Sequence, residues 1–446
     1  MAVNEKPKPV KKSAVEIAIM WFRRDLRLKD NAALYHALRS GYKVLPVFIF
    51  DSNILDDLAE KKDPRVEFIM DCLTAMQAIL KELGSGLVIK IGKPLSVWQE
   101  LLREYSITAV YSNRDYEQYA IQRDAAVADL LRENQVDFQQ FKDQVIFDQN
   151  EVVKDNGDPY TVFTPYSRKW LQTLTNFQLK PYPTERYVDQ FLPSKATALP
   201  SLTDIGFAKT GFNFPSKSLG KTLLTHYQRD RDFPALTGTS KLGIHLRFGT
   251  ISIRALAAYA RQYSDTYLKE LIWREFYQMI LFHFPQVNEG RSFKKEYDRI
   301  QWRHDEKDFQ RWCEGKTGYP LVDAGMRELN ATGFMHNRVR MVTASFLAKH
   351  LLIDWRWGEA YFASKLLDYD FASNNGGWQW AVGCGCDAAP YFRIFNPSLQ
   401  AKKFDPDNHY IHHWVPEMKE ASYVKPMVDH EMARKRCLET FSKALK

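Results

Sequence analysis

Cysteine is scarce in this sequence, and the few cysteines present form no recognisable framework. Only five occur in 446 residues: Cys72, Cys313, Cys384, Cys386 and Cys437. An odd number, spread thinly over a long chain, argues against a set of structural disulfides and indicates a reducing compartment. Cys384 and Cys386 form a C-x-C pair, but no second cluster of Cys or His lies near it in the sequence. Because zinc usually takes four convergent ligands, we expect no metal site.

Long apolar runs and the common nucleotide-binding loops are missing as well. No stretch reaches the roughly 18 apolar residues that a membrane-spanning helix needs, so we expect no membrane segment. The start, MAVNEKPKPVKKSAVE, has lysines but no apolar core or cleavage site, and we interpret residues 1–14 as a disordered leader. Neither G-x-G-x-x-G after the first strand nor G-x-x-x-x-G-K-[ST] is found, which excludes both classical phosphate loops.

Basic charge and aromatic rings are what the sequence has in excess. The net charge is +8 and the pI is near 9.0, which favours a polyanionic partner. The chain has 11 Trp, 22 Tyr and 28 Phe, more large rings than core filling requires, because a buried indole also needs a partner for its N–H. We therefore expect a function that uses rings.

The first third of the chain alternates between two kinds of pattern. Apolar, strand-like runs such as Ile17–Phe22 and Val44–Phe50 are separated by helical stretches. This alternation predicts a parallel α/β domain of Rossmann-like type over residues 15–147. Asp30 is expected to cap the first helix, over Ala32–Ala37.

The rest of the chain divides into two further parts. Residues 148–221 are rich in Pro, Ser, Thr and Gly, and we interpret them as a long, partly irregular linker. Over residues 222–446 helical periodicity dominates, which predicts an all-helical domain. The predicted fold class is therefore α/β plus all-α.

The densest group of unusual residues lies between Leu367 and Pro397, in LDYDFASNNGGWQWAVGCGCDAAPYFRIFNP. Asp368 and Asp370 would need partners if buried, and Arg338 and Arg340 stand just upstream. Acids beside paired glycines and tryptophans indicate a polar ligand in an aromatic-lined cavity. A purely structural network of ion pairs is the alternative.

Two other segments carry candidate chemistry. In TGTSKLGIHLRFGTIS, small hydroxyl residues and glycines lead into a helix and could supply donors to a phosphate, although a simple capped turn explains them equally well. In KELIWREFYQMI, helical spacing places Glu270, Trp273 and Tyr277 on one face. That face could line a site for a planar polar ligand, or it could be a core seam with a surface carboxylate.

These three segments, together with WFRRDLRLKDN, GKTGYPLVDAGMRELNATGFMHNRVRM and FDPDNHYIHHWVPEM, closely resemble the photolyase/cryptochrome family, and most of all its bacterial cyclobutane pyrimidine dimer photolyases. The resemblance implies an N-terminal antenna domain and a helical FAD-binding catalytic domain. It also implies a photo-lyase activity in which light drives electron transfer from reduced FAD to a flipped-out dimer in DNA.

The resemblance implies an FAD held in a U shape by residues scattered over the helical domain. Arg340 and Asp368 match an ion pair over the flavin, and Asn374 matches the residue that faces flavin N5. The full matching set is Tyr227, Thr239, Ser240, Lys241, Leu242, Gly243, Tyr267, Arg340, Asp368, Asp370 and Asn374.

Three tryptophans, Trp302, Trp355 and Trp378, match the family's electron relay from the surface to the flavin. The matching substrate pocket consists of Glu270, Trp273, Asn337, Met341 and Trp380. A flipped base is held by aromatic stacking and by hydrogen bonds to its edge, which suits this set.

Arg231, Arg338, Arg393, Gln400 and Lys403 match or neighbour positions that contact DNA phosphates in the family, which makes UV-damaged DNA the expected partner. We expect a monomer without an obligate protein partner, located in the cytoplasm and associated with the nucleoid through DNA. The alternatives are a cryptochrome-type blue-light receptor and a (6-4) photoproduct photolyase. A tyrosine at the usual position of Trp380, or histidines at those of Asn337 and Met341, would favour the other branches.

The family's second chromophore is the point where this sequence departs from one pattern. Folate-binding members carry an Asn-Glu pair where this chain has Tyr119 and Ala120. A folate of that type is therefore not expected. A deazaflavin, a second flavin or no antenna chromophore remain open.

Overall fold

The computed structural model describes residues 15–195 and 198–446, so the predicted leader over residues 1–14 lies outside the described residues. The chain divides into two compact units. The α/β unit contains the chain up to Ile146 with Lys180–Phe214 and Phe248–Ala255. The helical unit contains Phe147–Leu179, Pro215–Arg247 and Leu256–Lys446.

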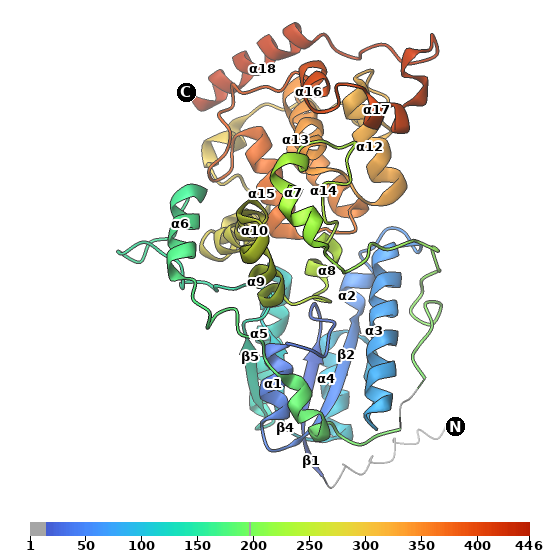
Figure 1. The fold of residues 1–446 in the computed structure, drawn as a ribbon, viewed down its shortest axis with the longest axis vertical. Helices are drawn as coiled ribbons and strands as arrows, with labels where there is room; N and C mark the ends of the chain where they lie inside the picture. The colour runs from blue at the N-terminus through green and yellow to red at the C-terminus, as the bar shows by residue number, and fades with distance from the viewer. Residues whose placement is uncertain (1–14, 196–197) are drawn as a thin grey trace, which may run out of the picture. The chain divides into compact units, whose positions relative to one another are not determined.

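The α/β unit is built on a five-stranded parallel sheet with strand order β3-β2-β1-β4-β5. Figure 1 labels β1, β2, β4 and β5 of this sheet. The parallel Rossmann-like sheet that the alternating pattern predicts is confirmed. The strands are β1 (Glu16–Phe22), β2 (Lys43–Asp51), β3 (Val88–Gly92), β4 (Ser106–Asn113) and β5 (Asp137–Phe141). The helices and turns between and after them are α1 (Ala32–Leu38), α2 (Ser52–Leu55), α3 (Pro64–Glu82), α4 (Pro94–Glu104), α5 (Gln118–Glu133) and η1 (Thr184–Gln190).

The sheet is covered on both faces, which explains its continuous apolar strands. Alternate residues of β1, including Ile17, Ile19 and Trp21, form a core with α4 and α5. Trp21 meets Trp98 of α4 edge to face, with ring centroids 5.3 Å apart. Helix α1 packs against β1 and β4 through its own buried residues.

The prediction that Asp30 caps α1 is wrong. The cap is Asn31, whose side-chain oxygen accepts a hydrogen bond from the Leu34 N–H at 3.1 Å. Asp30 has a φ of 49° and turns away from the helix. Its carboxylate accepts hydrogen bonds from Arg254 Nε at 2.9 Å and from the Tyr182 backbone N–H at 2.8 Å. Asp30 and Asn31 are both suitable N-cap residues. Asn31 is the cap because the Asp30 carboxylate is bound by Arg254 and Tyr182 instead.

The second unit consists of helices, as Figure 1 shows. Their buried side chains form one large apolar core. No helix among the described residues is long and apolar enough to cross a bilayer. The α-helices that lie wholly or mostly in this unit are α6 (Phe163–Thr173), α7 (Lys221–Asp230), α8 (Gly243–Arg247), α9 (Ile253–Tyr263), α10 (Asp265–His283), α11 (Glu306–Cys313), α12 (Pro320–Thr332), α13 (Asn337–Ser345), α14 (Trp355–Lys365), α15 (Phe371–Val382), α16 (Pro397–Phe404), α17 (His409–Trp414) and α18 (His430–Leu445). Short helical turns are η2 (Pro285–Glu289), η3 (Lys295–Arg299) and η5 (Pro416–Lys419), and η4 (Phe346–His350) is a π-helix.

The stretch over residues 148–221, interpreted as a linker, contains ordered elements that serve both units. Helix α6 lies in the helical unit, whereas η1 and the chain around it lie in the α/β unit. Pro, Ser and Thr are frequent here, but buried residues at positions 163, 166 and 170 give α6 an apolar face.

Asp143, which is 2% exposed, holds separate segments of the α/β unit together. Its carboxylate accepts hydrogen bonds from Arg27 Nη2 at 2.8 Å, from Arg254 Nη2 at 2.8 Å and from the Ala32 N–H at 3.1 Å. Burial alone would raise the pKa of Asp143, but the two guanidinium groups outweigh burial and hold that pKa below its ordinary value.

We expect Asp143→Asn to destabilise the protein by about 3–5 kcal/mol, because two buried cations lose their shared counter-ion. Urea unfolding followed by circular dichroism measures the change. Asp129→Asn is the matched control, since Asp129 pairs with Arg132 on the surface and exposed pairs contribute little. Because the pKa of Asp143 is depressed in the folded state, its contribution is complete above the unfolded pKa of about 3.9 and is lost as the pH falls further. Equal losses for the two variants would contradict this account.

Candidate functional site

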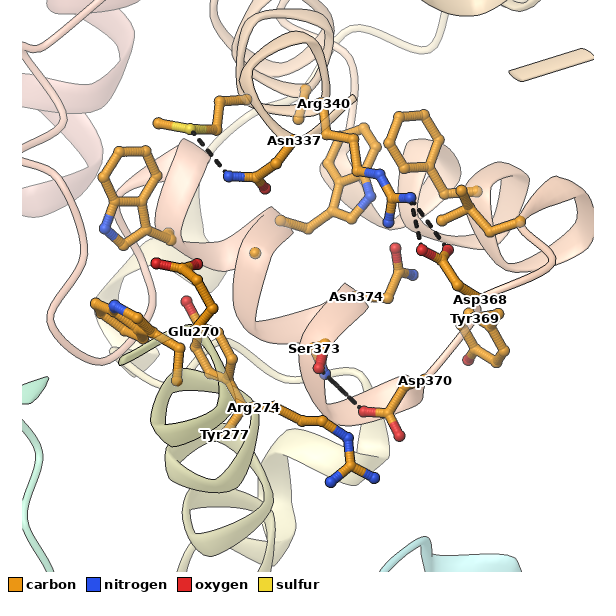
Figure 2. Close-up of a pocket in the computed structure, with 18 of the residues that line it drawn as sticks. Glu270, Arg274, Tyr277, Asn337, Arg340, Asp368, Tyr369, Asp370, Ser373 and Asn374 are labelled. Carbon is orange, nitrogen blue, oxygen red and sulfur yellow. Dashed lines mark hydrogen bonds and ion pairs between the residues drawn. The ribbon is translucent and has the colours of Figure 1, made fainter. Parts of the chain in front are cut away.

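The helical unit contains a cavity of about 390 Å³ between α10, α13 and α15 (Figure 2). Its wall combines apolar rings with charged and amide side chains, as ligand sites do. The residues predicted from sequence that line it are Arg231, Glu270, Trp273, Asn337, Arg340, Met341, Asp368, Asp370, Asn374, Trp378 and Trp380. Other lining residues are Arg274, Tyr277, Ala344, Phe362, Leu366, Tyr369, Ser373 and Gly377.

Helix periodicity explains why these side chains meet. On α10, Glu270, Trp273 and Tyr277 share one face, as predicted, and that face lines the cavity. Figure 2 shows Glu270 of α10 and Asn337 of α13 pointing into the same space. Helix α15 begins at its cap Asp370, whose carboxylate accepts a hydrogen bond from the Ser373 N–H at 3.1 Å.

The charged pair in the cavity wall is formed by Arg340 and Asp368. Arg340 Nη2 donates to both carboxylate oxygens, at 3.1 and 2.9 Å, and Arg340 Nε donates to the Met335 carbonyl at 2.8 Å. A Cβ added to Gly243 would lie only 2.6 Å from the Asp368 Cβ. The segment at Gly243 therefore packs directly against the pair, which requires glycine there. Since the paired acid also lines the cavity, this cluster belongs to a cavity wall and is more than a structural network.

Glu270 is paired with Arg231, a residue predicted to contact DNA phosphate. Arg231 Nη1 donates to Glu270 Oε1, and the guanidinium also lies over the Tyr227 ring at 5.3 Å. Burial alone would lower the pKa of Arg231. The Glu270 carboxylate outweighs burial and holds that pKa above its ordinary value. The cation of Arg231 is thus committed to the wall of this cavity.

Asn374 has a partner that sequence reasoning missed. Its amide nitrogen donates to Glu359 at the carbonyl oxygen, 3.2 Å, and at Oε1, 3.0 Å. Burial raises the pKa of Glu359, and the hydrogen bond from Asn374 opposes that rise. Arg274 was missed too, although it stands one turn after Glu270 on α10. Counting i+4 neighbours of each predicted site residue would have found Arg274.

Of the three predicted relay tryptophans, Trp378 alone lines this cavity. It is 2% exposed, and its indole N–H finds no acceptor within the described part of the chain. Trp355 is fully buried and Trp302 half-buried in the same apolar core. The tryptophan in ring contact with Trp378 is Trp312, at 6.1 Å, which the sequence did not single out.

The other residues predicted to bind the cofactor are Tyr227, Tyr267 and the run over residues 239–243, whose Gly243 packs against Asp368 of the cavity wall. Ser240 Oγ and the Tyr267 hydroxyl are 2.9 Å apart, and the rings of Tyr227 and Tyr267 are 4.9 Å apart. Lys241 has a φ of 51°, in the left-handed region, which shapes the turn before α8. The remaining members of this group are Thr239, Leu242 and Gly243.

A second cavity, also of about 390 Å³, brings together four of the five residues predicted to contact DNA. Arg338 pairs with Asp232 at 2.8 Å and lies over the Phe404 ring at 4.2 Å. The residues that line this second cavity are Arg229, Asp232, Phe233, Arg338, Arg393, Phe395, Gln400, Lys403 and Phe404. Arg338, Arg393 and Lys403 thus line this cavity together with phenylalanine rings, whereas Arg231 lines the first cavity.

Tyr119, the residue on which the expectation of no folate was based together with Ala120, lies on α5 of the α/β unit. Its hydroxyl donates to Asp51 Oδ2 at 2.5 Å and accepts from Asn53 Nδ2 at 3.1 Å. Burial and the Asp51 carboxylate raise the pKa of Tyr119 to about 12. Its phenol is thereby tied to the carboxyl end of β2.

Comparisons with known proteins agree with this geometry. The family described as "FAD binding domain of DNA photolyase" matches residues 267–422, and the family "DNA photolyase" matches residues 18–186. The chain is 37% identical to the deoxyribodipyrimidine photo-lyase of Halobacterium salinarum, over 96% of this chain and 99% of the relative.

Solved structures show the same relationship. A bacterial class III photolyase from Agrobacterium tumefaciens superposes with a TM-score of 0.84 at 33% identity, covering 100% of this chain and 99% of that one. An archaeal photolyase from Sulfolobus tokodaii with two FAD molecules gives 0.81 at 32% identity, covering 96% and 100%. The resemblance seen in the sequence motifs is thereby confirmed, and the chain belongs to the photolyase/cryptochrome family.

Proposed function

We propose that this protein repairs cyclobutane pyrimidine dimers in DNA with light, through an FAD held in the helical unit. The observation that carries the proposal is that one cavity joins two sets of side chains. One set, Arg340, Asp368 and Asn374, suits a flavin, and the other, represented by Glu270 and Trp273, suits a flipped base. Full-length relatives named deoxyribodipyrimidine photo-lyase support the same reaction.

The residues of the cavity fit a flavin. Its wall offers apolar side chains, an ion pair at Arg340 and Asp368, and the amide of Asn374. Ser240 and Lys241, beside the tight packing at Gly243, would hold the phosphates in this proposal. The family match to an FAD-binding domain supports the assignment.

Arg340, Asp368 and Asn374 would hold the flavin, and a bound, reduced FAD would supply light-driven electron transfer with no net redox change. The protein's own residues hold and orient. Arg340 and Asp368 compensate each other's charge, so the pair can respond to a change of charge beside it. Asn374, held by Glu359, presents an amide that adds no negative charge.

The substrate half of the cavity would bind the flipped dimer. Trp273 and Trp380 would form apolar walls, Glu270 and Asn337 would accept and donate hydrogen bonds at the base edges, and Met341 would add apolar contact. Because the Arg231 guanidinium pairs with Glu270, we expect the carboxylate oxygens of Glu270 to act as acceptors.

Two further roles complete the proposal. Trp378, Trp355 and Trp302 would relay electrons that reduce the flavin, since buried indoles are the protein's most easily oxidised rings and all three lie in or against one core. The second cavity would bind the flanking DNA backbone through Arg338, Arg393 and Lys403, helped by Gln400. Since one chain supplies every residue that lines the two cavities, we infer that a monomer is sufficient for repair. We expect it to act where the damaged DNA lies.

The alternative readings, a blue-light receptor or a (6-4) photolyase, are not favoured. Trp380, Asn337 and Met341 all line the first cavity, and two curated relatives that are 37% identical over 96% of this chain are named deoxyribodipyrimidine photo-lyase. A second chromophore remains part of the proposal. The two FAD molecules of the Sulfolobus photolyase make a second flavin a reasonable candidate, and Tyr119 leaves folate unfavoured.

The direct test illuminates the purified, FAD-loaded, reduced protein with an oligonucleotide that contains one thymine dimer. We expect absorbance at the thymine band to recover in blue or near-ultraviolet light and to stay constant in the dark. An FAD-bound protein that leaves every dimer intact, or that acts on a (6-4) photoproduct instead, would contradict the proposal.

We expect Glu270→Gln to weaken binding of a dimer-containing oligonucleotide about tenfold, because a charged acceptor is lost and Arg231 is left unpaired. Affinity for undamaged DNA and FAD content should not change. Titration with both oligonucleotides measures the difference, and the exposed Glu296→Gln is the control. Equal weakening for both DNAs would place Glu270 outside the lesion site.

Lys403→Met should weaken binding to all DNA sequences alike and reduce the slope of log affinity against log salt by about one, since one phosphate contact is lost. Lys402→Met is a matched control, because Lys402 is the neighbour on α16 but lines a different cavity. The slope is obtained from affinities measured between about 50 and 200 mM salt. A slope unchanged by Lys403→Met would remove the second cavity from the DNA interface.

A further inference from the structure

Helix α6 carries an aromatic stripe on its buried side. Phe163, Tyr166 and Trp170 are spaced by three and four residues, and each is at most 9% exposed. These rings face α10, the helix that presents Glu270 and Trp273 to the lesion cavity. A segment whose composition suggests an irregular linker thus forms the back of a functional helix.

Two polar contacts fix α6 in place at its two ends. Trp170 Nε1 donates to Glu275 Oε1 at 2.5 Å, and the Phe147 N–H donates to the same oxygen at 2.9 Å. Glu275 is 3% exposed, so its carboxylate is compensated by donors from the α6 region. At the other end, the Phe163 N–H donates to Asp387 Oδ2 at 3.1 Å.

The Phe163 ring lies flat against the Trp273 indole. Their centroids are 3.7 Å apart and their planes differ by 7°, the closest parallel ring contact on α10. The other rings around Trp273 meet it at an angle, Phe276 at 81° and Tyr277 at 34°. An indole has two faces, and Phe163 covers one of them. Trp273 also lines the cavity, so the face that Phe163 does not cover is the one we take to be available for stacking.

We infer that Phe163 is a positioning residue for dimer binding: it fixes the plane of Trp273, and so determines how well that indole stacks on the flipped lesion. The inference rests on the function proposed above. A flexible indole would lose rotamer freedom on each binding event, whereas one already stacked on Phe163 does not. Asp387, by holding the start of α6, sets where the Phe163 ring lies.

The test compares Phe163→Ala, Phe163→Leu and Phe163→Tyr in the FAD-loaded full chain. We expect Phe163→Ala to weaken affinity for a dimer-containing oligonucleotide about tenfold, equal to ~1.4 kcal/mol. The dimer affinity of Phe163→Leu, which keeps bulk without a flat ring, should lie between those of the wild type and Phe163→Ala. Phe163→Tyr should bind the dimer as the wild type does. Affinity for undamaged DNA, flavin absorbance and FAD content should match the wild type in all three.

A double-mutant cycle separates positioning from general stability. In a Trp273→Ala background, Phe163→Ala should cause no further loss of dimer affinity, since the ring it positions is gone. Tyr166→Leu is the matched control: Tyr166 is buried on the same face of α6 but contacts Phe276, with centroids 5.1 Å apart. It should lower the melting temperature while dimer affinity stays unchanged.

The outcomes distinguish this inference from the function it rests on. If wild-type protein repairs dimers but Phe163→Ala binds them normally, the inference fails and the function stands. Additive losses in the cycle, or equal losses of dimer binding for Tyr166→Leu, would also overturn it. If the wild type binds no dimer more tightly than undamaged DNA, the proposed function itself fails.

Discussion

The pairing of Arg340 with Asp368 is the interaction on which the central cavity depends. A carboxylate and a guanidinium in a half-buried wall are tolerable only together, because either one alone would lack compensation. The pair joins α13 to the segment before α15, and Gly243 leaves just enough room for Asp368. Polar chemistry is thereby held at one side of an otherwise apolar space. A redox cofactor whose charge changes during its cycle suits such a wall.

Helix α10 contacts both the cavity and helix α6. One face carries Glu270 and Trp273 to the cavity, while the neighbouring face carries Glu275 and Phe276 into contact with α6. Glu270 and Glu275 on this helix each have a donor, Arg231 for Glu270 and Trp170 for Glu275. These contacts hold the side of the helix that lines the cavity.

Much of the architecture was readable from local pattern. Alternating strands and helices predict the parallel sheet, and helical spacing predicts that Glu270, Trp273 and Tyr277 share a face. Strand β5, whose sequence DFQQF lacks an apolar run, is not recognisable in this way. The cap of α1 shows a different limit: Asp30 and Asn31 have equal local claims, and the distant Arg254 decides between them.

By itself, the sequence determined the family, the two kinds of domain and most residues of the candidate site, because period, cap chemistry and motif are local properties of the chain. Tertiary structure alone decided the pairings: Arg231 with Glu270, Asn374 with Glu359, and Phe163 on Trp273. These partners stand from 15 to 110 residues apart, as the intervals 359 to 374 and 163 to 273 show. No local rule links such positions, since only the packing of whole helices brings them within reach of one another.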